Sequence, residues 1–330
     1  MKNTKFLWYF IAFAILFVTG CKDDEEPAPT PINEAEVLAT YLESPDSPLG
    51  KYYVNTDLPS IILAEAVHAD VIAGKEMSII DIRSDADFAL GYIDGAVNVA
   101  AGDVLTYVMD EGLAKADKIV VVCYTGQTAG WATSVLRLNG YSNAFSMKWG
   151  MCSWHADFAT KWQNSISNTY STQFEDAAVP KGALGNMPTL STGKTTGQEI
   201  FDARVATLMA EGFGAAKITN ADVFANPDNY YIVNYWADAD YTHYGHVPGA
   251  MQYTPKEAIA LATDLKTLPA DKTVVVYCWT GQTSAFLTAY LRILGYDAKS
   301  LLFGANGMIY DDLESHKWSD SEIKGYDYEQ

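Results

Sequence analysis

The feature that most constrains this chain is a six-residue segment that occurs twice. The first copy consists of Cys123, Tyr124, Thr125, Gly126, Gln127 and Thr128, and the second of Cys278, Trp279, Thr280, Gly281, Gln282 and Thr283. Each copy follows a valine-rich run that is typical of a buried strand and precedes a helical pattern. A cysteine at this junction lies at a helix N-terminus, where backbone N–H groups favour the thiolate. We therefore expect both cysteines to be nucleophiles.

The repeat extends well beyond these two loops. Cys278 follows Cys123 by 155 residues (278 − 123), and the same interval relates Leu136-Arg137 to Leu291-Arg292. Upstream, residues 91–96 match residues 245–250 at an interval of 154. A drift of one residue is what a loop insertion or deletion leaves between duplicated domains. So long a period, with strands and helices inside it, indicates two domains and no solenoid.

Alternating strand and helix patterns define the expected fold. Helices are expected over 34–42, 61–73, 129–138, 198–210 and 284–294, and strands over 78–82, 118–122, 144–147, 231–233, 273–277 and 301–303. Apolar strands that alternate with helices predict an α/β fold with two tandem domains, each a mostly parallel sheet with helices on both faces. The predicted domains are 35–165 and 197–330. The linker 166–196, rich in Ser, Thr, Gly and Pro, is expected either to pack on the domains or to stay mobile.

The N-terminus predicts export. Lys2 and Lys5 precede an apolar run over 6–18, which is shorter than the about 20 residues that span a bilayer, so residues 1–20 are interpreted as a signal peptide. The segment 18–21 resembles the lipobox of bacterial lipoproteins, which implies lipidation of Cys21. An uncleaved anchor and a plain signal peptide are the alternatives. Residues 21–34, acidic and proline-rich, are expected to form a tether. The expected location is the bacterial envelope, lipid-anchored at the outer membrane and either periplasmic or surface-exposed.

Charge and cysteine content exclude several function classes. The formal net charge of -19 argues against a nucleic-acid partner and against binding to an anionic membrane surface by charge. Four cysteines with no zinc-finger spacing predict neither a disulfide framework nor a metal site.

Two further motifs flank the first loop. The upstream motif comprises Asp81-Ile82-Arg83, then Phe88, then Gly91-Tyr92-Ile93-Asp94-Gly95-Ala96-Val97-Asn98. The downstream motif is Trp149-Gly150. In this order around the cysteine loop, they resemble the signatures of the rhodanese family. The resemblance implies a thiol-based sulfurtransferase in which sulfane sulfur moves from a small donor to the loop cysteine, and then to cyanide or a thiol. It implies catalytic roles for Cys123 and Cys278, substrate-binding roles for the other loop residues, and no cofactor; a protein partner is not specified.

The second copy departs from this pattern. Asn234 and Trp236 replace Asp81 and Arg83, while His246 is retained where the first copy has Tyr92. We expect the replacement to alter local packing more than chemistry, and neither domain is excluded as active. Neither loop contains Arg or Lys, so we expect weak turnover of thiosulfate and better turnover of a neutral or thiol-bound persulfide.

Alternatives remain for Cys152 and for the function. Cys152 is either a thiol that forms a disulfide with Cys123 or a small apolar filler. The competing function is a non-catalytic binding or redox-sensing module. A phosphatase with this fold is disfavoured, because its loop would be longer and close with an arginine that grips phosphate.

Overall fold

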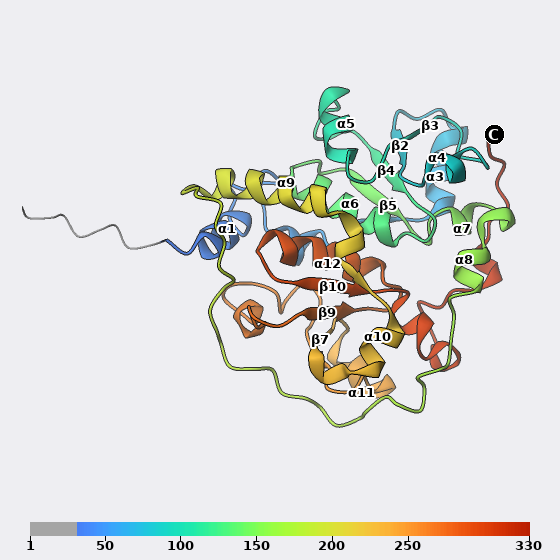
Figure 1. Cartoon of the computed structure of the whole chain (residues 1–330). Helices are drawn as coiled ribbons and strands as arrows, with labels where there is room; N and C mark the ends of the chain where they lie inside the picture. Colours follow the sequence, from blue (N-terminus) through green and yellow to red (C-terminus); the bar gives the residue numbers. More distant parts are fainter. Residues whose placement is uncertain (1–31) are drawn as a thin grey trace, which may run out of the picture. The chain divides into compact units, whose positions relative to one another are not determined.

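The computed structural model describes residues 32–330 as two five-stranded sheets covered by helices (Figure 1). Every strand pairing within the two sheets is parallel. The strand orders are β1-β5-β4-β2-β3 and β6-β10-β9-β7-β8, so the second sheet repeats the topology of the first. The predicted tandem α/β fold is confirmed.

From residue 32 onward, the first half of the chain contains five strands and eight α-helices. The strands are β1 (Ile61–Ile62), β2 (Ser78–Asp81), β3 (Ala96–Asn98), β4 (Ile119–Val122) and β5 (Ala144–Met147). The helices are α1 (Glu34–Leu42), α2 (Tyr53–Thr56), α3 (Ala64–Ile72), α4 (Asp85–Phe88), α5 (Val104–Asp110), α6 (Gln127–Leu138), α7 (Met151–Trp154) and α8 (Thr160–Gln163). The loop cysteine Cys123 falls between β4 and α6.

The second half repeats this plan with fewer α-helices. Its strands are β6 (Lys217–Ile218), β7 (Tyr231–Asn234), β8 (Met251–Gln252), β9 (Val274–Tyr277) and β10 (Ala298–Leu301). Its α-helices are α9 (Gly197–Ala215), α10 (Asn220–Ala225), α11 (Asp238–Tyr244) and α12 (Gln282–Ile293). Cys278 falls between β9 and α12.

Two of the expected elements lie at positions other than those expected. The expected helix over 61–73 begins only at Ala64, because Ile61 and Ile62 form an edge strand paired with β5. The expected strand over 301–303 lies instead at 298–301, where its pairing with β9 fixes the register. Lys299 interrupts the apolar pattern of that strand, so hydrophobicity alone placed it too late.

Both faces of each sheet are buried. In β4, Ile119 and Val121 belong to one hydrophobic cluster, whereas Val120 and Val122 belong to another on the opposite face. In β9, the alternate residues divide between two clusters in the same way. Because successive strand residues point to opposite faces, a sheet covered on both sides needs the apolar runs seen in the sequence.

Helices α6 and α12 pack against each other between the two sheets (Figure 1). One hydrophobic cluster contains residues from both helices and from both sheets. The close approach occurs at Gly130, where an added Cβ would lie 3.1 Å from the ring of Phe286. The Ser134 hydroxyl also donates to the Phe286 carbonyl at 2.9 Å. The two domains therefore share a core.

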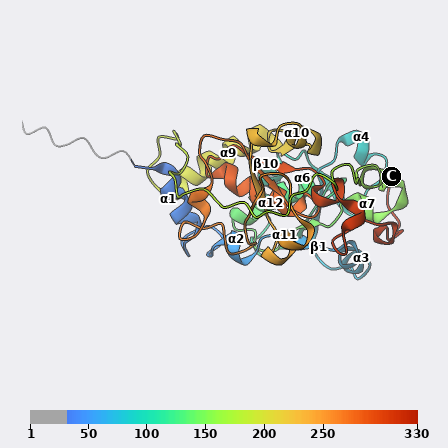
Figure 2. The ribbon, with the colours of Figure 1, turned by 90° about the horizontal axis from the view of Figure 1, so that it is seen from below.

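The segments outside the two sheets cross between the domains. The residues between α8 and α9 follow the second domain, where Glu175 pairs with His246, so this linker packs on the protein. The C-terminal residues return to the first domain, where Glu329 pairs with Tyr92. Helix α1 packs on α9, and Figure 2 shows this pair at one end of the described chain and the C-terminus at the other.

Within residues 32–330, no helix combines the length and apolar character needed to cross a membrane. In the same range, no group of three or more His, Cys, Asp or Glu side chains could hold a metal ion. The predicted signal peptide, Cys21 and most of the predicted tether lie outside the described residues.

Candidate functional site

The first candidate site is the Cys123 thiol at the carboxyl end of the central strand β4. Its Sγ accepts hydrogen bonds from the backbone N–H groups of Gly126 (3.2 Å) and Ala129 (3.3 Å). Gly126 is the N-cap of α6 and has a φ of 85°, a left-handed conformation that turns the chain from the strand into the helix. The loop therefore curls around the sulfur, with N–H groups directed at it.

Burial dominates the ionisation of this thiol. The Cys123 side chain is 5% exposed, and loss of solvent raises its pKa. The carboxylate of Asp81 raises it further, while the N–H groups of Ala129, Thr125 and Gly126 lower it. Because the net pKa is raised, the resting group at neutral pH is the thiol. The helix N-terminus alone, on which the sequence expectation rested, does not outweigh burial.

In the second candidate site, the cysteine also lies between a central strand and a helix, but its sulfur has a different hydrogen-bond partner. Cys278 is 1% exposed, and its Sγ accepts from the backbone N–H of Ser284 at 3.3 Å. The thiol donates to the Ser284 hydroxyl at 3.6 Å, and that hydroxyl lies 2.8 Å from the hydroxyl of Ser300. Sequence reasoning missed Ser284, although the interval of 155 residues aligns it with Ala129 of the first loop.

A second segment closes each loop from the side. In the first domain, the Met151 N–H donates to the Cys123 carbonyl at 2.8 Å, and the Cys152 N–H donates to the Tyr124 carbonyl at 3.1 Å. Gly150, just before them, has no room for a side chain, because a Cβ there would lie 2.3 Å from the Cys123 carbonyl oxygen.

The second domain repeats this closure with different residues. The Ala305 N–H donates to the Cys278 carbonyl at 3.0 Å, and the Asn306 N–H donates to the Trp279 carbonyl at 3.2 Å. Asn306 therefore occupies the place that Cys152 has in the first domain. Its side chain adds a 2.8 Å hydrogen bond to the same Trp279 carbonyl.

Cys152 is a buried free thiol. Its Sγ donates to the Phe158 carbonyl at 3.0 Å, and burial raises its pKa to about 12. A protonated, hydrogen-bonded thiol in an aromatic cluster is a poor nucleophile. The structure thus favours the apolar-filler interpretation over a disulfide with Cys123, which is also free.

The glutamine of each loop reaches into the other domain. Gln127 Oε1 accepts from the Phe303 N–H at 2.9 Å, and Gln282 Nε2 donates to the Ser146 hydroxyl at 2.7 Å. A Cβ at Gly281 would lie 2.3 Å from Gln127 Oε1, so the glycine makes room for the crossing side chain. Both amides, included in the predicted substrate-binding loops, are therefore already engaged between the domains.

Thr125 and Thr280 form hydrogen bonds with residues of their own loops. The Thr125 hydroxyl accepts from Gln127 Nε2 at 3.1 Å, and the Thr280 hydroxyl accepts from the backbone N–H of Gln282 at 3.2 Å. Thr128 and Thr283 are half-buried on the first turns of the following helices.

Cations from outside the first loop lie beside its Tyr124. Lys161 Nζ is 3.5 Å from the centroid of the Tyr124 ring, and the guanidinium carbon of Arg83 is 5.3 Å from it. Lys148 lies 4.9 Å from the ring of the neighbouring Trp149. Sequence reasoning looked for cations only inside the loops, and nothing in the local sequence connects Lys161 of α8 with Tyr124.

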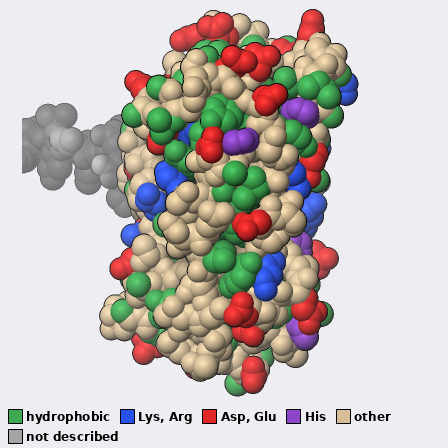
Figure 3. All heavy atoms as spheres, turned by 90° about the vertical axis from the view of Figure 1, so that its right-hand side faces the viewer, with side chains coloured by type: hydrophobic (Ala, Val, Ile, Leu, Met, Phe, Trp, Pro, Cys, Tyr) green, Lys and Arg blue, Asp and Glu red, His purple; other side chains and the backbone are tan. Residues whose placement is uncertain are grey.

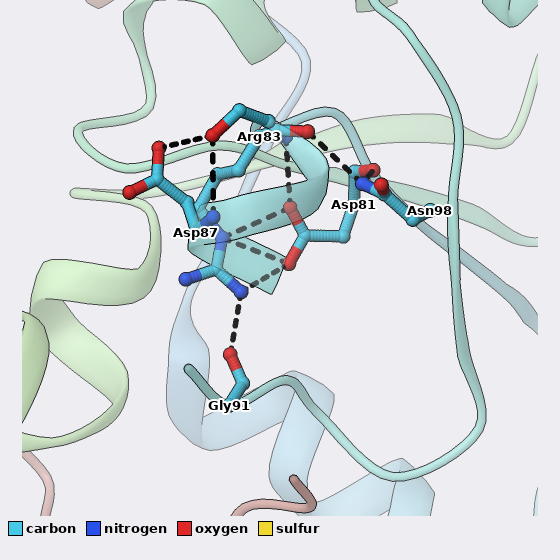
Figure 4. A network of polar contacts seen from close by, with 6 residues as sticks. Asp81, Arg83, Asp87, Gly91 and Asn98 are labelled. Carbon is cyan, nitrogen blue, oxygen red and sulfur yellow. Dashed lines mark hydrogen bonds and ion pairs between the residues drawn. The ribbon is translucent and has the colours of Figure 1, made fainter. Parts of the chain in front are cut away.

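Arg83 forms the acidic–basic pair of the first motif with Asp81, which holds its side chain in place (Figure 4). Its Nη2 lies 2.6 Å from Asp81 Oδ2 and donates to the Gly91 carbonyl at 2.6 Å. Asn98 completes the network with hydrogen bonds to the carbonyls of Asp81 and Arg83. The pair thus joins the end of β2 to the segment that follows α4.

Aromatic packing replaces this pair in the second domain. The ring of Trp236 stacks on Trp279 with centroids 4.1 Å apart, and His316 stacks on the same ring at 5.3 Å. Asn234 donates to the Tyr277 hydroxyl at 2.7 Å. The retained His246 is buried, with its ring nitrogens 3.1 Å from two backbone carbonyls, so its role is structural.

The family described as "Rhodanese-like domain" matches this chain twice, over residues 63–157 and 194–308. The chain belongs to the rhodanese-like family. The first match contains β2 to β5 and the second β6 to β10, and each includes one cysteine loop and the segment that closes it. The resemblance inferred from the motifs is confirmed as a tandem of two rhodanese-like domains.

Two sulfurtransferase relatives match a length of about one domain at modest identity, and one solved structure aligns with most of the chain. A "Thiosulfate sulfurtransferase GlpE" of Shewanella oneidensis is 34% identical over 82 residues, which is 24% of this chain and 78% of that protein. A namesake from Pseudoalteromonas translucida is 25% identical over 92 residues, 28% of this chain and 86% of that protein. A crystal structure of thiosulfate sulfurtransferase from Pseudomonas aeruginosa aligns with 87% of this chain and 48% of its own, at 18% identity and a TM-score of 0.30.

Proposed function

We propose that this protein is a sulfurtransferase that carries sulfane sulfur as a persulfide on its loop cysteines. The observation that carries the proposal is the sulfur of Cys123, which accepts two backbone N–H hydrogen bonds in a rhodanese-like domain. The similarity to proteins named thiosulfate sulfurtransferases supports the same reaction class.

The reaction consists of two displacements at sulfur. The Cys123 thiol first loses its proton to solvent, and the thiolate attacks the outer sulfur of the donor. A new sulfur–sulfur bond forms as the donor's own bond to that sulfur breaks, and the electron pair leaves with the donor remnant. An acceptor such as cyanide or a thiolate then attacks the outer persulfide sulfur and regenerates the Cys123 thiolate.

The loop is suited to the anionic states of this cycle. The N–H groups of Gly126 and Ala129 converge on Sγ, and such preorganised donors stabilise negative charge in a site that excludes water. They offset part of the desolvation cost that raises the thiol pKa.

Mass spectrometry tests the proposal directly. The chain is exposed to thiosulfate or to glutathione persulfide, digested without reductant, and the peptides containing Cys123 and Cys278 are weighed. One added sulfur atom on a loop cysteine, removed by cyanide with release of thiocyanate, is the expected result. Absence of added sulfur on both cysteines with both donors would refute the proposal.

A binding or redox-sensing module is the second candidate function. The observation that favours it is the burial of Cys278, which is 1% exposed. Under this alternative, persulfide forms on the protein in stoichiometric amount, but addition of cyanide gives no turnover.

We also propose that the protein is lipid-anchored in a bacterial envelope through Cys21. The support is the lipobox-like segment 18–21 and the acidic, proline-rich stretch that follows it. Labelling of growing cells with a fatty-acid analogue tests it, because Cys21→Ser would abolish both the label and the membrane association.

A further inference from the structure

The two loops present different chemical surroundings to a substrate. In the first domain, the residue after the cysteine is Tyr124, which has Lys161 and Arg83 beside its ring. In the second, it is Trp279, which stacks on Trp236 and His316. The difference includes two replacements in the repeat, of Tyr124 by Trp279 and of Arg83 by Trp236.

The charge beside Tyr124 is available to an anion. Lys161 is exposed, so its ammonium group is open to solvent and to a small ligand. Arg83 is buried and paired with Asp81, yet its Nη1 has no hydrogen-bond partner among the described residues. Asp87 is the acidic group that faces Tyr124 and opposes this field.

These cations are a local feature and do not belong to a broad basic surface. Figure 3 shows the face on which α7, α8 and the C-terminus of Figure 1 lie, and acidic, basic and apolar side chains are mixed over it. The whole chain carries a net charge of -19. Selection of an anion therefore depends on the few cations beside the first loop.

Trp279 is packed against aromatic rings, with the charged Lys148 and Asp240 near His316. Burial, and then the charge of Lys148, lowers the pKa of His316, so its uncharged form stacks on the tryptophan. Tyr244 contacts the same ring at 5.3 Å. Packed aromatic rings compensate the desolvation of a small dianion poorly, which disfavours its approach to this loop.

We propose that the two loops take different classes of sulfur compound: Cys123 a small anionic sulfane-sulfur donor, and Cys278 a neutral or thiol-bound persulfide. The inference rests on the sulfurtransferase function proposed above and assigns its substrates. It also restricts the expectation of poor thiosulfate use to the second loop, since the first has cations that do not belong to the loop itself.

The two loading reactions balance without a further reactant. With thiosulfate, the Cys123 thiolate bonds to the outer sulfur, the bond between the two thiosulfate sulfurs breaks, and sulfite leaves with the electron pair. With glutathione persulfide, the Cys278 thiolate bonds to the terminal sulfur, and glutathione leaves as the thiolate, which takes up a proton.

Site-resolved loading rates test the inference. Thiosulfate is expected to load Cys123 at least about fivefold faster than Cys278, which corresponds to a charge interaction of the size seen at partly exposed sites. Glutathione persulfide is expected to reverse the preference. Equal loading by thiosulfate, or faster loading of Cys278, would overturn the inference and leave the sulfurtransferase function standing. No loading of either cysteine by either donor would overturn both.

A charge variant identifies the residue responsible. Lys161→Gln is expected to slow thiosulfate loading of Cys123 about threefold, to slow its loading by glutathione persulfide less, because the charge of that donor is spread over a larger molecule, and to weaken the salt dependence of the thiosulfate reaction. Lys272→Gln is the matched control, because it removes the same charge from an exposed lysine that precedes β9 in the second domain. Equal slowing by both variants, or none by Lys161→Gln, would contradict the assignment.

Discussion

At the scale of single residues, Cys123 is subject to opposed influences. Burial and the charge of Asp81 disfavour its anion, while three backbone N–H groups favour it. A free thiol in water would be more acidic than this one, so the loop does not produce a highly reactive resting thiolate. It holds the sulfur ready for a donor whose reaction converts the thiol into a persulfide, a more acidic group.

The pH dependence of alkylation follows from the raised pKa of Cys123. Because only the thiolate reacts, the rate of alkylation by iodoacetamide is expected to keep rising as pH increases beyond about 8.5, the ordinary value for cysteine. Peptide mass spectrometry of Cys123 over a series of pH values measures this. A rate that levels off near neutral pH would contradict the raised pKa.

Gly150 is expected to be the most sensitive glycine of the first site. In Gly150→Ala, the methyl group would overlap the Cys123 carbonyl, at 2.3 Å, in a backbone with a φ of 61°. We expect the free energy of unfolding to fall by about 4 kcal/mol and persulfide formation to be lost.

Gly74→Ala separates the two causes. Gly74 has the same φ of 61° but nothing within 4 Å of an added Cβ, so only the backbone strain remains. We expect a loss of about 1 kcal/mol there, measured by urea unfolding. Equal losses in the two variants would mean that the contact with the loop is not what requires glycine at 150.

At the scale of elements, the strands and helices that could be predicted from the sequence are those whose pattern occurs in both repeats. The apolar strands β4 and β9, the helices after them and the cysteines between them were found because each signal is strong and occurs twice. The short strands β3 and β8 were missed, since two or three residues give no measurable period.

The site was predicted only as far as it is contiguous in sequence. The loops were found, whereas Lys161 and His316 come from segments outside any motif and reach the loops through tertiary packing. The engagement of Gln127 and Gln282 could not be foreseen either, because it depends on how α6 meets α12.

Because Gln127 and Gln282 each form hydrogen bonds with the other domain, we expect a substitution in one domain to affect the other. Gln282→Ala would leave the Ser146 hydroxyl and the Met147 carbonyl without its amide, and Ser146 in turn bonds the Gly126 carbonyl of the first loop. We expect a loss of about 2 kcal/mol in stability and a changed alkylation rate at Cys123.

The control for this variant is Gln173→Ala, which removes an exposed glutamine of the linker. It is expected to alter neither quantity measurably. An unchanged Cys123 rate in Gln282→Ala would show that the first loop does not depend on the amide from the second domain.

At the scale of the whole molecule, the shared core makes the two domains interdependent. One hydrophobic cluster includes Ile80 of the first sheet, Val276 of the second, and residues of α6 and α12. Helix α1 belongs to the same cluster and also contacts the second domain through the ion pair of Glu36 with Lys266, at 2.7 Å. Removal of either half would expose the part of this shared cluster that the other half covers.

Unfolding of the full chain is accordingly expected to be a single transition. A chain ending at residue 163 is expected to show no cooperative transition by circular dichroism in urea, because α6 would expose the surface that α12 covers. Co-expression with residues 164–330 should restore it. An isolated first half with the midpoint of the full chain would disprove this interdependence.

The position of α1 also determines where a pulling force would enter the protein. Helix α1 begins at Glu34, near the N-terminal end of the described residues, and packs on α9 of the second domain. Tension applied at that end would reach the contact between α1 and α9 before it reached the first sheet. A protein held by its N-terminus would therefore bear load first on its second domain, and the Cys123 loop would be the mechanically sheltered one.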